Sequence, residues 1–349
     1  MRISRWVQAA AVAVLAVAAA PIAAARAEAA VVDREVAFSV RNVDESGVPC
    51  GTDGGTYTVR GHLTGPADLL AGGAASSVSL YVHGLEVSEW FWRFDGAPGY
   101  DHVREMAGRG HVSVTIDRLG YGASGQPAGA QSCVGGQATA VHQIVGQLRS
   151  GLYTAPGGAI SFGRVALLGH SLGGAVTQIA AYSFRDGDAI GVLSYSDLAL
   201  TPEQLAGSLT WGARCVAGGQ PSPAGAPGYS YLTADEAGFR RDFLAGAPPE
   251  VAAAAAPLRA LNPCGDMVSL TEATLVDPAR LGEITVPVLV LTGTEDRVFD
   301  VNRARFQGEL FTGSGDVTTV LVDGATHGLT LEPTRFRDEL DSWLTTRGF

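Results

Sequence analysis

Short, continuously apolar segments alternate with amphipathic segments along most of the chain. The apolar runs at 78–82, 112–116, 164–168 and 286–293 each end in a glycine-rich or polar turn. Runs of this length and character are typical of strands buried on both faces of a parallel sheet. Because helical patterns separate several of these strands, the sequence predicts an α/β fold with a mostly parallel central sheet flanked by helices.

Two amphipathic segments predict helices that pack on this sheet. The first runs over about 137–152, and the second lies near the C-terminus. Their apolar faces consist of Ala138, Val141, Val145, Leu148 and Leu152 in the first, and Phe336, Leu340, Trp343 and Leu344 in the second.

The spacing of these elements also predicts the domain organisation. Short strands and turns are expected in 28–77, and core elements in the remainder of 28–197 and in 283–349. The intervening 198–282 separates two core strands where a short connection would suffice. We therefore expect 198–282 to form a cap or lid insertion that influences specificity. Its aromatic residues could line a hydrophobic pocket, but for most of them we expect packing in the core of the cap itself.

The N-terminus has the pattern of a targeting segment. Arg2 and Arg5 precede an apolar run over 6–20, and Ala25-Arg26-Ala27 is a small-residue cleavage site. This pattern predicts a Sec-type signal peptide over 1–27, and a secreted, extracellular mature protein that begins at Glu28. A retained membrane anchor is the alternative, although an alanine-rich segment inserts weakly into a bilayer.

Composition excludes several classes of function. The 349 residues carry a net charge of −11, which disfavours nucleic-acid binding. All 24 basic residues are arginine, so a Schiff-base mechanism, a Ser-Lys dyad and a Walker A phosphate loop are excluded. The seven histidines and four cysteines form no H-E-x-x-H or clustered metal-binding pattern, and we expect no cofactor and no metal.

The pentapeptide Gly169-His170-Ser171-Leu172-Gly173 carries the most specific chemical signal. It follows the apolar run 164–168 and precedes a small-residue helical segment at 174–181. A G-x-S-x-G between a strand and a helix is typical of a nucleophile elbow, in which a sharp turn exposes the serine. The alternative is a glycine-rich turn with an incidental serine. We predict that Ser171 is a nucleophile.

The order of residues along the chain identifies a candidate base and acid. His327 is the only histidine after Ser171, and it lies in a loop that follows the apolar run 318–322. A carboxylate that orients its imidazole is expected between the two. Asp296 follows the strand 286–293 and is our choice, with Asp197 as runner-up. Glu295 and Asp300 are expected to be solvated neighbours.

Two backbone amides are candidates for an oxyanion hole. The N–H of Leu172 follows the nucleophile directly, and that of Leu85 lies in the turn after the strand 78–82. Glu86 and Glu89 come close behind Leu85, and a carboxylate pointing into the site would oppose a developing negative charge. His83 as a metal ligand is the competing interpretation of this segment, but it has no partner at ligand spacing.

A dinucleotide-binding pattern is also present in Gly120-x-Gly122-x-x-Gly125. Gln126-Pro127 follows where a helix should begin, so no helix N-terminus is available for a pyrophosphate. We therefore reject this interpretation.

Taken together, these motifs resemble the secreted α/β-hydrolase superfamily, and in particular its serine esterases and lipases. The matching residues fall in the family's order over about 78–345, and a serine at the elbow argues against the related dehalogenases and epoxide hydrolases. They are His83-Gly84, 117–125, 169–173, 293–296 and His327-Gly328. The resemblance implies an α/β-hydrolase fold and nucleophilic chemistry, but it is weak on substrate.

Four cysteines in an exported protein fit two disulfides, and three pairings are possible. We favour Cys215–Cys264, both within the insertion, and Cys50–Cys133, which would tie the N-terminal extension to the core. Free buried thiols are the alternative.

We therefore expect an extracellular serine hydrolase that cleaves a small-molecule carboxylic ester through a Ser171-Asp296-His327 triad. Amide, peptide and thioester substrates are alternatives for the same triad. A binding protein on a hydrolase scaffold is a further alternative from another class. We expect no nucleic-acid partner and no stable membrane anchor after cleavage. Acyl length, natural substrate and oligomeric state are left open.

Overall fold

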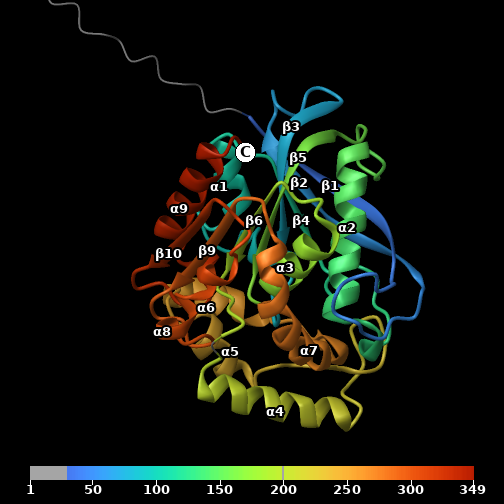
Figure 1. Cartoon of the computed structure of the whole chain (residues 1–349), viewed down its shortest axis with the longest axis vertical. Coiled ribbons are helices and arrows are strands. Elements are labelled where there is room, and N and C mark those ends of the chain that lie inside the picture. The colour runs from blue at the N-terminus through green and yellow to red at the C-terminus, as the bar shows by residue number, and fades with distance from the viewer. Residues whose placement is uncertain (1–29, 199) are drawn as a thin grey trace, which may run out of the picture.

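A computed structural model describes residues 30–198 and 200–349, so the predicted signal peptide over 1–27 lies outside the described residues. An eight-stranded sheet runs through the molecule in the order β1-β2-β4-β3-β5-β6-β9-β10 (Figure 1). β2 pairs antiparallel with β1 and β4, and the other pairs are parallel, which confirms the prediction of a mostly parallel sheet. The strands are β1 Val31–Arg41, β2 Thr56–Pro66, β3 Ala74–Val82, β4 Ser113–Ile116, β5 Ser161–His170, β6 Ala189–Leu193, β9 Val288–Gly293 and β10 Val317–Val322.

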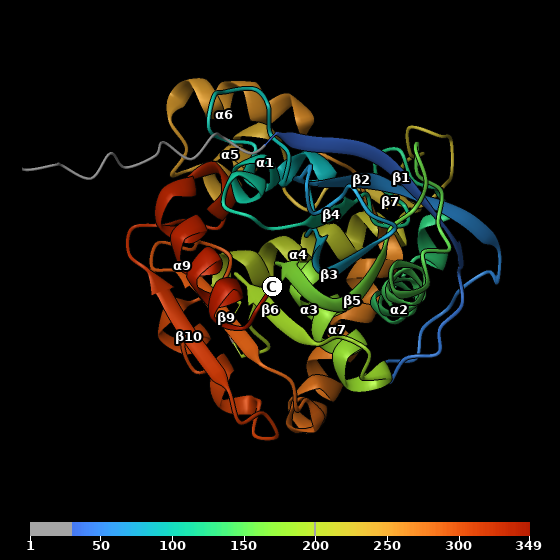
Figure 2. The ribbon, with the colours of Figure 1, turned by 90° about the horizontal axis from the view of Figure 1, so that it is seen from above.

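Helices cover both faces of this sheet. α2 and α3 pack together on one face, while α1 and α9 lie against each other on the opposite face (Figures 1 and 2). The core helices are α1 His102–Gly108, α2 Val134–Ser150, α3 Leu172–Phe184, α8 Val301–Ala304 and α9 Pro333–Thr346. Short 3₁₀ turns occur at Glu89–Phe91, Gly129–Gln131, Ala256–Leu258, Leu281–Glu283, Gln307–Leu310 and Leu329–Leu331.

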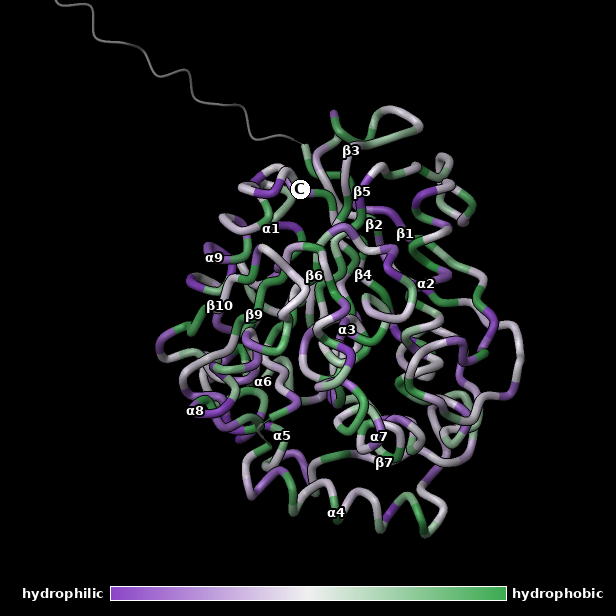
Figure 3. The backbone as a smooth tube through the Cα atoms, in the orientation of Figure 1, coloured by the Kyte–Doolittle hydropathy of each residue, from purple (hydrophilic) through white to green (hydrophobic). Residues whose placement is uncertain are grey.

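The central strands are apolar because they are covered on both sides. Every residue of β4, β6 and β9 is buried, and these strands form part of the hydrophobic centre of the molecule (Figure 3). β10 closes the sheet on one edge, and its residues are mostly exposed or half-buried. On α9, Phe336, Leu340, Trp343 and Leu344 are buried as the helical spacing predicts.

The prediction for α2 was wrong at its end. The helix begins at Val134 and ends at Ser150, because Gly151 adopts a left-handed conformation with φ of 68° and stops it. Leu152 therefore lies beyond the helix, and it is 75% exposed rather than part of the buried face. Ala138, Val141, Val145 and Leu148 are buried as expected.

Further helices and two short strands come between β6 and β9 in the sequence, within the segment 198–282 that is predicted to form a cap. It contains α4 Pro202–Val216, β7 Tyr229–Ser230, α5 Glu236–Phe243, α6 Pro249–Ala255, β8 Asn262–Pro263 and α7 Cys264–Arg280. Figure 1 shows α4 as the outermost element at one end of the molecule, with α5 and α7 between it and the sheet. We call this segment the cap; its independence as a unit stays a prediction.

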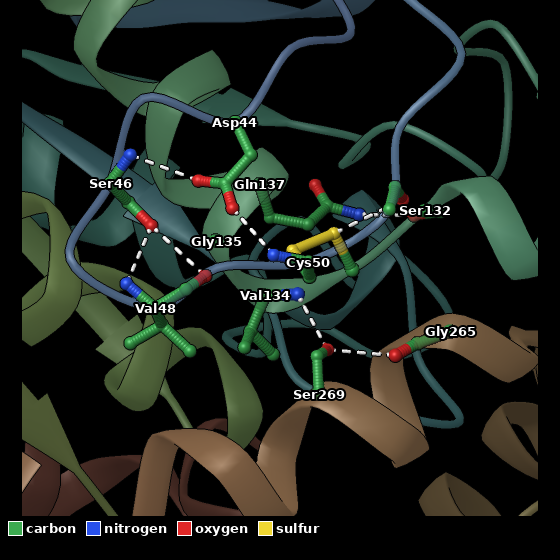
Figure 4. Close-up of a disulfide and its surroundings, with 12 residues drawn as sticks. Asp44, Ser46, Val48, Cys50, Ser132, Val134, Gly135, Gln137, Gly265 and Ser269 are labelled. Atoms are coloured by element: carbon green, nitrogen blue, oxygen red, sulfur yellow. Dashed lines mark hydrogen bonds between the residues drawn. A yellow bond between two sulfur atoms is a disulfide. The ribbon is translucent and has the colours of Figure 1, made fainter. Parts of the chain in front are cut away.

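One disulfide lies within the core and another within the cap. Cys50 is bonded to Cys133 and Cys215 to Cys264, which is the pairing favoured from the sequence. The first fixes the segment after β1 to the start of α2. Within this segment, the Cys50 N–H also donates to Asp44 at 2.7 Å (Figure 4). The second joins α4 to the start of α7. Ser269 of α7 accepts from the Val134 N–H at 2.9 Å, so the cap also contacts the N-terminus of α2 (Figure 4).

Within residues 30–198 and 200–349, no helix has the length and apolar character needed to cross a membrane.

Candidate active site

Ser171 stands at the turn between β5 and α3, as the G-x-S-x-G pattern predicts. Its backbone has φ of 53° and ψ of −128°, a strained conformation for a residue with a side chain. Strain of this kind is typical of functional turns, where the surrounding structure holds the residue in place. The side chain is almost buried, with 6% of the residue exposed.

The glycines of the pentapeptide are required by close packing. A Cβ atom on Gly169 would clash with the backbone of Gly173, and one on Gly173 would clash with the carbonyl of Val82 in β3. The elbow can therefore approach the neighbouring strand only because these positions have no side chain.

His327 and Asp296 meet as predicted from their order in the chain. The Nδ1 of His327 lies 2.9 Å from Oδ2 of Asp296, and both side chains are fully buried. The other carboxylate oxygen of Asp296 accepts from the backbone N–H groups of Val298 and Phe299, at 2.8 and 3.1 Å. These two bonds fix the carboxylate, so it can hold the imidazole with a proton on Nδ1.

The other ring nitrogen of His327 has a different environment. His327 Nε2 is buried and has no hydrogen-bond partner among the described residues. The loop that carries His327 contacts the elbow, because His170 Nε2 bonds to the His327 carbonyl at 2.8 Å. Burial and the neighbouring His327 lower the pKa of His170 well below its usual value. His170 is therefore a neutral donor next to the candidate nucleophile.

The runner-up acid, Asp197, lies in a different environment. It follows β6 and accepts from Gln178, Gln307 and Tyr195 at 2.7, 2.6 and 2.9 Å. Its carboxylate therefore bonds to amide and phenol donors, whereas Asp296 bonds to His327. Glu295 is exposed, as expected, and Asp300 caps α8 through the Asn302 N–H.

The two candidate oxyanion donors are the backbone N–H groups of Leu85 and Leu172. Leu85 and Leu172 both line the pocket into which Ser171 opens. Leu172 is the first residue of α3, so its N–H has no partner within the helix. In the part of the chain that the structure describes, neither this N–H nor that of Leu85 donates to another backbone group or a side chain.

The carboxylates of the two glutamates behind Leu85 have hydrogen-bond partners within the protein. The carboxylate of Glu86 bonds to Leu232, Thr233 and Arg259 in the cap. The carboxylate of Glu89 accepts from His62 and Thr115, whose backbones belong to β2 and β4. Neither glutamate is in the lining of the Ser171 pocket.

His83 has a structural environment. Its Nε2 accepts from the Arg118 N–H at 3.0 Å, and its Nδ1 lies 2.9 Å from the Gly84 carbonyl. Both ring nitrogens are therefore engaged within the protein. Among the described residues, no group of three or more histidine, cysteine, aspartate or glutamate side chains is arranged to hold a metal ion.

The pocket at Ser171 has a volume of about 360 Å³ and lies between the core and the cap. Its walls come from the cap helices α4 and α7 and from loops after β6 and β9. Within the described residues, no Asp, Glu, Arg or His side chain lines it. The apolar side chains of the lining are Leu85, Leu172, Leu200, Leu205, Leu209, Trp211, Leu232, Phe243, Met267, Leu270, Val298 and Phe299.

The aromatic residues of the cap divide between two roles. Trp211 and Phe243 line the pocket, and Phe243 also packs edge-on against the His327 ring at 5.0 Å. Tyr229 and Phe239 are buried outside the pocket lining, and Tyr231 lies under the guanidinium of Arg259.

A family model described as the alpha/beta hydrolase family matches residues 80–339 of this sequence, which is most of the chain. The chain belongs to the alpha/beta hydrolase family. The match includes the elbow, both candidate oxyanion amides, Asp296 and His327.

Several solved structures of alpha/beta hydrolases resemble this one. A thermophilic esterase from Thermogutta terrifontis is 17% identical, with a TM-score of 0.58, over 88% of this chain and 98% of its own. A monoacylglycerol lipase from Paleococcus ferrophilus is 19% identical, with a TM-score of 0.56, over 78% of this chain and 95% of its own. A hydrolase from Pseudomonas aeruginosa PA01 is 22% identical, with a TM-score of 0.56, over 86% of this chain and 97% of its own. At these identities the likeness shows the shared fold.

Sequence reasoning missed residues that contact the segment around Leu85 in this alpha/beta hydrolase. Arg118, Arg259 and Asp266 are buried or nearly buried and form ion pairs between core and cap. Arg118 lies in a motif quoted for the family resemblance, but its partner is 148 positions away. Nothing in local spacing marks Arg259 or Asp266, because their partners are set by how the cap docks.

Proposed function

We propose that this alpha/beta hydrolase is an extracellular serine hydrolase that cleaves a carboxylic ester through an acyl-enzyme intermediate. The observation that carries the proposal is the buried contact between His327 Nδ1 and Asp296 Oδ2, which leaves His327 Nε2 without a partner among the described residues. That is the arrangement required of a general base whose orientation is fixed by a carboxylate.

In the proposed reaction, Ser171 Oγ attacks the ester carbonyl while His327 Nε2 accepts the serine proton. The imidazolium then gives this proton to the leaving alcohol, and the acyl group stays on Ser171. A water molecule, deprotonated by the same nitrogen, then attacks the acyl-enzyme. The imidazolium returns this proton to Ser171 Oγ as the bond to the acyl group breaks and the acid leaves. The Asp296 carboxylate orients His327 and stabilises the imidazolium in both steps.

The tetrahedral intermediates carry a negative charge on the former carbonyl oxygen. Leu85 and Leu172 line the pocket together with Ser171, and their N–H groups are the proposed donors to this oxyanion. A preorganised donor of this kind lowers the barrier by about 3 kcal/mol, because it does not have to reorient as charge develops.

The pocket supports an uncharged, mostly apolar acyl group as the substrate portion next to Ser171. Its lining is dominated by leucine, aromatic and methionine side chains, and burial of apolar surface there would favour binding. A charged acyl group would lose hydration in this lining without gaining a partner of opposite charge.

Export is part of the proposal. The pattern over residues 1–27 supports a signal peptide, and two disulfides are compatible with an oxidising compartment. An exported enzyme of this kind would meet its ester outside the cell.

The experiment that tests the reaction type is a substrate panel on the purified mature protein. Chromogenic esters of acetyl to decanoyl length should be hydrolysed, whereas aminoacyl anilides of similar size should react far more slowly. Ser171→Ala should abolish ester turnover. Hydrolysis of the anilides at the higher rate would replace the ester proposal with an amide or peptide substrate, and turnover by Ser171→Ala would refute the nucleophile.

A further inference from the structure

The proposed oxyanion donor Leu85 lies between two buried ion pairs that each join the core to the cap. On one side, core Glu86 pairs with cap Arg259 at 2.9 Å; on the other, core Arg118 pairs with cap Asp266 at 3.1 Å. The polarity of the two pairs is opposite, since the core supplies the anion in one and the cation in the other.

The Glu86 side is held by several cap segments at once. One carboxylate oxygen accepts from the Leu232 N–H at 2.5 Å and the Thr233 N–H at 3.2 Å. The other accepts from the Thr233 hydroxyl at 2.5 Å and Arg259 Nε at 2.9 Å. Because this side chain is fully buried, these donors replace the hydration that an ionised carboxylate would lose.

The backbone of Glu86 is attached to the cap as well. Its N–H donates to Asn262 Oδ1 at 2.8 Å, and its carbonyl accepts from the Ala260 N–H at 2.8 Å. Glu86 also adopts a left-handed conformation with φ of 64°, which a residue with a side chain adopts only when its surroundings compensate. Cap residues therefore hold the peptide that follows Leu85 in its conformation.

The peptides before Leu85 are held from the core. Arg118 Nε donates to the His83 carbonyl at 2.8 Å, and its Nη2 donates to the Gly84 carbonyl at 3.2 Å. The same guanidinium reaches Asp266 at the start of α7, to which Tyr121 also donates at 2.9 Å. The Gly84 carbonyl belongs to the same peptide unit as the Leu85 N–H, so Arg118 fixes the plane of that amide.

We propose that Glu86 and Arg118 are positioning residues that hold the Leu85 N–H for the oxyanion, and that cap residues Arg259 and Asp266 keep them in place. The inference rests on the proposed function, since it assigns the cap a part in the oxyanion geometry of that same site. The docked cap then contributes to transition-state stabilisation in addition to enclosing the acyl group.

A transition-state analogue distinguishes this role from a merely structural one. An alkyl trifluoromethyl ketone adds to the serine and forms a hemiketal oxyanion, so its affinity depends on the donors. Glu86→Gln and Arg259→Lys should each lower kcat for an acetyl ester and raise the ketone Ki by about 10- to 100-fold, a part of the loss seen when an oxyanion donor is removed. KM should change by less than about threefold, because ground-state binding uses other contacts.

The matched control is Arg149→Gln. Arg149 pairs with Asp188 at 2.6 Å and donates to the carbonyls of Gly163 and Asp186, near the start of β5 and away from the elbow. This variant should leave kcat and Ki at wild-type values even if it unfolds at a lower temperature.

The possible outcomes distinguish failure of this inference from failure of the proposed function. Unchanged kcat and Ki in folded Glu86→Gln or Arg259→Lys would overturn the inference, and so would equal losses in Arg149→Gln. If Glu86→Gln does not fold, Arg259→Lys decides the question alone, because it keeps the charge and removes only the forked geometry. Ester turnover by Ser171→Ala would instead defeat the proposed function itself.

Discussion

At the scale of single residues, two carboxylates compete for the role of acid, and their surroundings separate them. Asp296 has one oxygen held by two backbone N–H groups and the other directed to His327 Nδ1. Asp197 is surrounded by the side chains of Gln178, Gln307 and Tyr195. The order along the chain admits both, and only the three-dimensional contacts distinguish an imidazole partner from an amide network.

Replacing Asp296 by asparagine should lower kcat by about 10⁴ and preserve the fold. The asparagine amide would face His327 Nδ1 and favour the tautomer with a proton on Nε2, which cannot accept the serine proton. Steady-state kinetics together with circular dichroism test this prediction. The matched control is Asp197→Asn, which should stay much closer to the wild-type rate; collapse of that variant with an active Asp296→Asn would reassign the acid.

At the scale of elements, α3 contacts α7 through Asp277, a buried carboxyl group of α7 that lies near Asp197 of the loop after β6. Gln178 on α3 donates through its amide nitrogen to both Asp197 and Asp277, each at 2.7 Å. Tyr182 donates to Asp277 at 2.7 Å, and the charge of Arg280 interacts with Asp277. Burial and the neighbouring Asp197 raise the pKa of Asp277 to about 8. Below that pH one proton is retained between the two carboxyl groups.

This pair predicts a specific dependence of stability on pH. Because the folded pKa of Asp277 exceeds its unfolded value of 3.8, the protonated group stabilises the fold at low pH, and this contribution is lost as pH rises to about 8. Asp277→Asn supplies an uncharged side chain at every pH. The free energy of unfolding in urea, measured at pH 5 and pH 9, should therefore fall less with pH in Asp277→Asn than in the wild type. Equal pH dependence in both proteins would contradict the prediction.

The cap helices make a second prediction at this scale. Trp211 of α4 lines the pocket, whereas Phe239 of α5 is buried outside its lining. Each methylene of fit in an apolar pocket is worth about 1–3 kcal/mol. Trp211→Ala should therefore change kcat/KM for long acyl chains much more than for acetyl esters. Phe239→Ala, the control for lost cap packing, should affect all chain lengths alike. If Trp211→Ala instead lowered kcat/KM equally at all acyl lengths, Trp211 would not determine acyl-chain specificity.

At the scale of the whole molecule, the parts predicted well from sequence are those that local patterns determine. The apolar runs identify strands such as β9, and the glycines around Ser171 identify the elbow, because burial and a tight turn constrain nearby residues directly. The end of α2 was missed, since Gly151 stops the helix one residue before an apolar leucine that fits the pattern. The partners of Glu86 could not be predicted, because they lie about 146 to 173 positions away and depend on how the cap docks.

Export and oxidation predict the mass of the mature protein. Secreted material should begin at Glu28, and its intact mass should be four hydrogens below that of the fully reduced chain, because both cysteine pairs are oxidised. Intact-mass spectrometry before and after reduction measures this directly. A retained N-terminus would refute cleavage, and four alkylatable thiols under denaturing, non-reducing conditions would refute the two disulfides.

The most direct test of the account is to locate the covalent adduct of a fluorophosphonate probe on the folded protein. Peptide mass spectrometry should find a single adduct on Ser171, formed slowly or not at all in His327→Ala, because the imidazole is needed to activate the serine. Ser171→Ala should show no labelling. An adduct on another residue, or labelling that persists in Ser171→Ala, would contradict the claim that Ser171 is the nucleophile.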